Sequence, residues 1–262
     1  LLVDQGTADA GDITIGPEGT LISEVASAVP VAVRPNGGRG GTFTVNGRLV
    51  LAGSGQRINM LTTAFNNIVE YNSAIGQSMA AKYTGTGLYE YNHLVLSGGG
   101  TKILADNTTV RGSLTRKGTA TLSLGSPTAK TLTYGPDAEL IYGGTALQTT
   151  GPELSAAGAG GIAALRVENP AGVRLGQNLL VKNSLTLGGD LDTGTYALTL
   201  GAQAACAGAG DVLGTVLRPG PVSAGTYCLG NPNLQITLAP GATLPSSFSA
   251  VMSTGIAPFS GA

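Results

Sequence analysis

The chain has 262 residues, of which 42% are hydrophobic, 11% are charged and 42 are glycine, and its formal net charge at pH 7 is −1. An ordinary soluble domain is roughly 25% charged, so this chain lacks the basic surface that gathers phosphates, and we expect no nucleic-acid partner. No apolar run reaches the length of about 18 residues that a membrane-spanning helix needs, so we expect no membrane span. Glycine scattered among Val, Leu, Thr and Ser favours tightly turned β-structure.

Residues 1–88 have a less regular β-rich pattern. Apolar and polar residues alternate over 42–51 around Asn46-Gly47, a pair that is typical of a hairpin turn. Apolar residues between 58 and 69 then fall near helical spacing, which predicts a short helix over 57–71; an irregular connection or further strands are the alternatives. We expect residues 1–88 to form a cap or a separate small domain ahead of a repetitive region at 89–262.

An internal repeat organises the region from residue 89 onward. Seven residues recur 71 positions later in fixed register: Leu94, Leu104, Asn107, Val110, Ser113, Leu114 and Thr115 are matched by Leu165, Leu175, Asn178, Val181, Ser184, Leu185 and Thr186. Within each copy, a shorter interval of 20 residues separates Leu94 from Leu114 and Leu165 from Leu185. Leu alternates with Thr or Ser, as in half-buried strands, and glycines separate the strands. The sequence therefore predicts an all-β fold, a parallel β-helix or β-solenoid of roughly 20-residue coils.

The two cysteines, Cys206 and Cys228, have no CxxC spacing and no neighbouring histidine, which disfavours a metal site. In an oxidising compartment we expect them to form a disulfide that closes a loop of about twenty residues and contributes on the order of 3 kcal/mol. Two buried free thiols are the alternative.

The sequence offers little for catalysis or cofactor binding. His93 is the single histidine, and no serine or cysteine can be paired with it by spacing. Asp190 and Asp192 stand two residues apart and are the candidate ligands for Ca²⁺, which prefers oxygen donors. The calcium-binding nonapeptide pattern is not matched, however, and aspartates at turns usually bind their own backbone. We expect no cofactor and no catalytic residue, with Ca²⁺ at the two aspartates as the alternative.

A polysaccharide lyase or glycosidase is the enzymatic alternative. Such activity on a β-helix would need carboxylates and basic residues gathered on one outer face, and the candidates are Glu90, Lys102, Asp106, Arg111, Arg116 and Lys117. The chain has few charges and no tryptophan to stack on sugar rings. We therefore expect a protein that is not an enzyme.

Three stretches carry a resemblance: YNHLVLSGGGTK at 91–102, LRVENPAGV at 165–173 with its continuation at 185–194, and GNPN at 230–233. They resemble segments of large secreted bacterial surface proteins with β-helix-like repeats, and the resemblance covers residues 89–238. It implies an adhesin-like or envelope-associated structural role, an extracellular or cell-surface location, and no defined active site.

We therefore expect an extracellular structural protein that self-associates into a surface fibre through its strand edges. The apolar start of the chain, Leu1-Leu2-Val3, or the late segment Leu234–Leu238 would supply a strand to a neighbouring copy. The alternative is an adhesin whose outward Thr, Ser and Asn side chains bind surface glycans.

Overall fold

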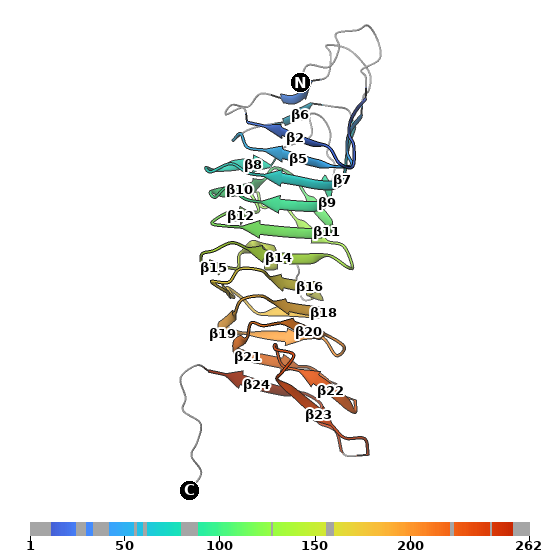
Figure 1. Cartoon of the computed structure of the whole chain (residues 1–262), viewed down its shortest axis with the longest axis vertical. Coiled ribbons are helices and arrows are strands. Elements are labelled where there is room, and N and C mark those ends of the chain that lie inside the picture. Colours follow the sequence, from blue (N-terminus) through green and yellow to red (C-terminus); the bar gives the residue numbers. More distant parts are fainter. Residues whose placement is uncertain are drawn as a thin grey trace. The chain divides into compact units, whose positions relative to one another are not determined.

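A computed structural model describes residues 12–24, 30–33, 42–54, 57–59, 62–79, 89–126, 128–155, 160–220, 223–241 and 243–253. The chain divides into two compact units, the first at 1–143 with 151–157 and the second at 144–150 with 158–262. In both units, short strands stack in parallel ladders, and turns or bends join each strand to the next. The predicted all-β solenoid is therefore confirmed (Figure 1). Each unit is described separately below.

The first unit consists of short strands and one short helix. They are β1 (Ile13–Ile15), β2 (Thr20–Ser23), β3 (Pro30–Val33), β4 (Thr42–Val45), β5 (Arg48–Leu51), β6 (Arg57–Asn59), β7 (Thr62–Tyr71), β8 (Gln77–Met79), β9 (Tyr89–Leu96), β10 (Thr101–Leu104), β11 (Thr108–Lys117), β12 (Thr121–Ser123), β13 (Leu132–Tyr134), β14 (Glu139–Gly143) and α1 (Pro152–Ser155).

The coils of the first unit have three faces. One face runs through β1, β4, the first halves of β7, β9 and β11, and β13. A second runs through β2, β5, the second halves of the same three long strands, and β14. The third contains the parallel strands β8, β10 and β12. Because β7, β9 and β11 bend from one face to the next, each contributes to two ladders.

Columns of identical or similar side chains form the core of the first unit. Val69 pairs with Leu94, Leu94 with Leu114, and Leu114 with Leu140, and all four side chains are buried. The 20-residue interval between Leu94 and Leu114 is therefore one coil, as the sequence predicts. Each column removes apolar surface from water along the whole ladder. This burial stabilises the fold by about 25 cal/mol for each Å² of apolar surface.

The second unit repeats the three-faced arrangement and ends differently. Its strands are β15 (Gln148–Thr149), β16 (Ile162–Val167), β17 (Val173–Arg174), β18 (Leu179–Leu187), β19 (Leu191–Leu200), β20 (Ala205–Gly208), β21 (Val212–Arg218), β22 (Gly225–Cys228), β23 (Gln235–Leu238) and β24 (Phe248–Met252). Leu165, Leu185 and Cys206 occupy successive positions of one ladder, and Val173, Leu191 and Val212 form a buried column of another. After β21 the pairing becomes antiparallel, in β21–β24 and in the hairpin β22–β23.

The predicted helix over 57–71 is wrong, because this stretch contains strands β6 and β7. Phe65 and Val69 are both buried in β7, and the register of β7 against β9 shifts between Phe65 and Ile68. The extra residue at this bend places two inward side chains four positions apart, which imitates helical spacing. The short helix of the structure is α1, at Pro152–Ser155.

The hairpin predicted around Asn46-Gly47 is also wrong. The flanking strands β4 and β5 do not pair with each other but lie parallel to β7, on two successive faces. Gly47 occupies the corner between them, where an added Cβ would lie 2.2 Å from the carbonyl oxygens of Gly16 and Gly19 on the preceding coil. An Asn-Gly pair suits this corner because glycine permits the close approach of two backbones.

The predicted domain boundary after residue 88 touches residues 80–88, which lie outside the described part of the chain. On either side of it, β7 and β9 pair in parallel within the first unit. The separate status of residues 1–88 stays a prediction.

Candidate functional site

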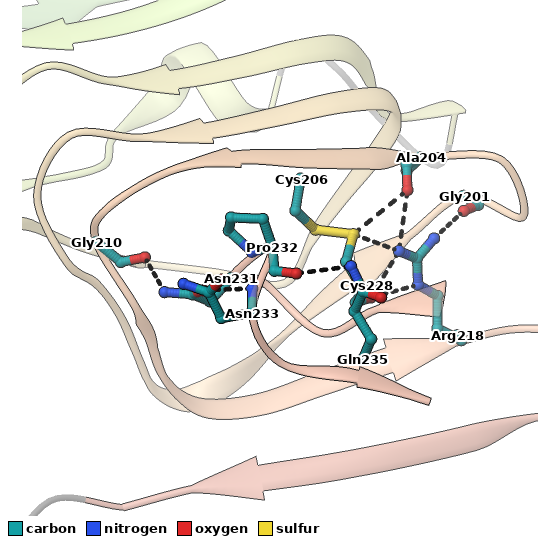
Figure 2. The surroundings of a disulfide bond; sticks show 10 residues. All are labelled: Gly201, Ala204, Cys206, Gly210, Arg218, Cys228, Asn231, Pro232, Asn233 and Gln235. Atoms are coloured by element: carbon teal, nitrogen blue, oxygen red, sulfur yellow. Dashed lines mark hydrogen bonds between the residues drawn. A yellow bond between two sulfur atoms is a disulfide. The ribbon is translucent and has the colours of Figure 1, made fainter. Parts of the chain in front are cut away.

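A disulfide anchors the end of the second unit, where the parallel ladder stops (Figure 2). Cys206 of β20 and Cys228 of β22 are bonded, with Cα atoms 6.0 Å apart and a sequence separation of 22. The bond expected from the sequence is thus present, and it ties the hairpin β22–β23 to the last parallel coils. We call β20, the hairpin β22–β23 and Arg218 of β21 the C-terminal cap.

Arg218 is the central polar group of this cap. The residue is 1% exposed, and its guanidinium donates hydrogen bonds to the backbone oxygens of Cys228 at 2.6 Å, Gly201 at 2.6 Å and Ala204 at 2.9 Å (Figure 2). Burial lowers the pKa of Arg218 below its ordinary value. Three carbonyl groups thus satisfy a buried cation and join β21 to the hairpin and to the coil before it.

Sequence reasoning missed Arg218. The signal that could have revealed it is its position in the alternation of the strand. Val212 and Val216 of β21 are buried, and Arg218 follows at the next inward position. An arginine at an inward position of an alternating strand needs internal partners, because a buried charge without them is costly.

Asn231 fixes the loop between β22 and β23. Its amide nitrogen donates to Asp211 Oδ1 at 2.7 Å and to the Gly210 carbonyl at 3.2 Å, and its Oδ1 accepts from the amide of Asn233 at 2.8 Å. The GNPN stretch therefore acts as a turn held against the preceding coil.

The two candidate calcium ligands bind protein groups at corners of the second unit. Asp192 Oδ1 accepts from the amide of Gly194 at 2.8 Å, and Oδ2 accepts from Arg174 Nε at 2.8 Å. The hydrogen bond from Gly194 is the largest cause and lowers the pKa of Asp192; burial opposes it, and Arg174 lowers the pKa further. Asp190 Oδ1 accepts from the amide of Asp211 at 2.9 Å. In the described residues, no three His, Cys, Asp or Glu side chains gather as a metal site.

The basic residues considered for polysaccharide cleavage do not share an outer face. Lys102 is fully buried, and its ammonium donates to the carbonyl of Ser73 at 2.5 Å. Burial lowers the pKa of Lys102 to about 8. Arg116 also points inward and forms a buried ion pair with Glu153 of α1. Two of the cations that the polysaccharide-cleaving alternative would need on an outer face are therefore buried in the core.

Three other residues considered in the sequence, Glu90, Arg111 and His93, take part in contacts between neighbouring coils of the first unit. Glu90 and Arg111 form an exposed ion pair on neighbouring coils, with 2.5 Å between Arg111 Nη2 and Glu90 Oε2. His93 Nδ1 lies 2.9 Å from Ser113 Oγ in a partly buried contact between β9 and β11. Both contacts bridge adjacent strands of the ladder.

Strand β1 of the first unit and strand β24 of the second unit are the candidate sites for strand addition. Among the described residues, β1 pairs with β4 alone and β24 with β21 alone. Val251 of β24 is 73% exposed. Of the two segments predicted to donate a strand, Leu1-Leu2-Val3 lies outside the described residues, and Leu234–Leu238 mostly forms β23, which already pairs with β22.

None of the helices found in the described residues is long and apolar enough to cross a membrane. No protein-family model matches the chain, and neither the curated proteins nor the solved structures contain a significant match.

Proposed function

We propose that this chain is an extracellular structural protein, a β-solenoid subunit of a surface fibre that assembles through strand edges. The observation that supports the proposal is the single pairing of β1 and of β24 within the described residues. An unpaired edge presents a row of N–H and C=O groups that can pair with another chain. Joining two different edges head to tail need not close into a ring, so it generates a fibre.

The side chains of β24 favour an edge that is open to strand addition over an edge that is protected from it. Proteins protect exposed edges with charges, proline or a strong twist, whereas β24 has the sequence FSAVM with no charge and no proline. Its alternate residues are partly exposed, including Val251. A second copy that adds a strand here would cover this apolar side chain.

The composition and the disulfide suit a durable extracellular component. Sparse charge and columns rich in buried Leu and Val make each coil depend on packing rather than on surface ion pairs. The Cys206–Cys228 bond would persist in an oxidising compartment. A structural subunit of this kind needs no catalytic group, and we propose that the chain is not an enzyme.

Electron microscopy of the purified chain under non-denaturing conditions tests this proposal. We expect filaments, and we expect Val251→Lys in β24 and Thr14→Lys in β1 each to shorten or abolish them, because edge lysines oppose strand pairing. Leu147→Lys is the matched control, since Leu147 is also exposed and apolar but lies between strands. Isolated particles from the unmodified chain at all concentrations, or filaments equally sensitive to the control, would contradict the proposal.

A further inference from the structure

A shallow groove of about 420 Å³ opens on the outer face of the first unit, over β7, β9 and β11. Its polar lining comes from three successive coils. We call it the corner groove and define it by Thr63, Asn66, Glu90, Asn92 and Arg111. Its volume falls in the range of about 300–1,000 Å³ that is usual for small-molecule sites.

The groove arises from a difference in chain length at one corner of the solenoid. At this corner each long strand has residues that lie between its two paired segments. In β7 these residues are Asn66 and Asn67, and in β11 they are Arg111 and Gly112. The strand between them, β9, crosses with Asn92 alone. The middle coil is therefore one residue shorter than both neighbours, which leaves a recess between their bulges.

Asparagine side chains are stacked along this corner. Asn66 Nδ2 donates to Asn46 Oδ1 at 2.9 Å, and Asn92 Nδ2 donates to the carbonyl of Asn66 at 3.0 Å. Each amide has two N–H donors and an oxygen that accepts two hydrogen bonds, so these contacts use only part of its capacity. The ladder holds Asn66 and Asn92 in position and leaves hydrogen-bonding groups for a ligand.

An ion pair that also lines the groove presents both donors and acceptors. Arg111 uses Nη2 to bind Glu90 Oε2, and their side chains are 64% and 46% exposed. A guanidinium has five N–H donors and a carboxylate has two oxygens, so both residues retain capacity for further hydrogen bonds. Because the two charges offset each other, the groove does not favour either an anion or a cation.

The aromatic residues beside the groove exclude a stacking mode of recognition. Phe65 is 5% exposed and Tyr91 is 1% exposed, and their rings stack on each other with centroids 5.0 Å apart. A ligand in the groove therefore meets amides, a hydroxyl and an ion pair, beside a smaller apolar surface that includes Ala64. The geometry points to an uncharged, hydroxyl-rich oligosaccharide as the ligand, because each sugar hydroxyl both donates and accepts a hydrogen bond. This binding site is additional to the strand edges and does not depend on fibre assembly.

A glycan array with the full-length chain tests the site. The probes are neutral hexose oligosaccharides beside uronate-containing and sulfated ones, followed by calorimetric titration of the best binder. We expect saturable binding of a neutral class. The double variant Glu90→Gln, Arg111→Gln keeps the net charge of the groove at zero but removes the charge-assisted bonds, and Asn92→Ala removes an amide. Each is expected to weaken binding about tenfold, which is typical of losing one or two such bonds.

Arg174→Gln is the matched control, because Arg174 and Asp192 form a comparable exposed pair in the second unit, 2.8 Å apart. It should leave glycan binding unchanged. A preference for acidic glycans, no saturable binding of any neutral glycan, or equal loss in the control would overturn the inference. Binding and filament formation are measured separately, so failure of one does not decide the other.

Discussion

The guanidinium of Arg116 and the carboxylate of Glu153 form an ion pair inside the first unit, with side chains only 4% and 0% exposed. Glu153 Oε1 also accepts from Tyr142 Oη at 2.8 Å and from the amide of Gly151 at 2.8 Å. The short helix α1 brings Glu153 to this position, so the segment 151–157, which follows β15 in the chain and belongs to the first unit, is fastened to β11.

Removing one member of this pair should be far more damaging than removing both. Arg116→Met leaves a buried carboxylate without its cation, which typically costs about 3–5 kcal/mol. The double variant Arg116→Met, Glu153→Gln removes both charges and should recover much of that loss. Urea unfolding followed by circular dichroism gives the comparison, and a double variant no more stable than Arg116→Met would contradict it.

The disulfide should protect the C-terminal cap rather than the whole chain. Replacing Cys206 and Cys228 by serine releases a loop of 22 residues, which we expect to cost about 3 kcal/mol. Hydrogen exchange should accelerate at the amides of β22 and β23 and stay unchanged in β7, β9 and β11. Uniform acceleration over both units would show that the bond acts globally instead.

Because Lys102 is buried, the free energy of unfolding should rise with pH in the alkaline range. The pKa of Lys102 is about 8 in the folded chain, below its ordinary value of 10.5, so between these values the unfolded state binds more protons. Stability should therefore rise as the pH increases from 8 to 10.5, by up to about 3 kcal/mol from this group. Urea midpoints across this range provide the measurement. Lys102→Met should remove the rise, and an equal rise in that variant would assign it to other groups.

Two glycines with positive φ should respond differently to alanine. Gly208 has a φ of 93°, and an added Cβ would lie 2.1 Å from the backbone oxygen of Leu187. Gly194 has a φ of 57°, and an added Cβ would meet nothing within 4 Å. Gly194→Ala should cost only the left-handed backbone penalty of about 1–2 kcal/mol, whereas Gly208→Ala should destabilise the chain by more. Thermal unfolding of the two variants side by side distinguishes them, and similar losses would contradict the argument from close approach.

The repeated coil could be predicted from the sequence because it depends on local alternation and a fixed interval. Leu94 and Leu114, or Leu165 and Leu185, mark the same inward position one coil apart, and no three-dimensional information is needed to count them. The two wrong predictions, the helix over 57–71 and the hairpin at Asn46-Gly47, both fall where a coil turns a corner. At both corners the buried positions keep an even spacing through the bend, as Val45 and Leu49 do, so periodicity alone does not reveal that the chain moves to another face.

The polar groups of the interior could not be predicted in the same way. Arg116 and Glu153 are 37 residues apart, and the partners of Arg218 are backbone carbonyls that carry no side-chain signal. The corner groove depends on β9 having one residue fewer than its neighbours between paired positions, a difference that becomes visible only once the strands are aligned. Long-range contacts and exact coil lengths thus lie beyond what composition and spacing reveal.

The columns of buried leucine and valine also constrain how the length of such a chain can change. Duplicating or deleting a whole coil, such as the 20 residues 94–113, leaves every remaining strand in phase with its neighbours. Inserting one residue within a strand instead would turn each following inward side chain outward. Corners tolerate single insertions, as the unequal crossings of β7, β9 and β11 demonstrate. The first unit can therefore lengthen or shorten by whole coils, whereas a change of a single residue is tolerated only at its bends.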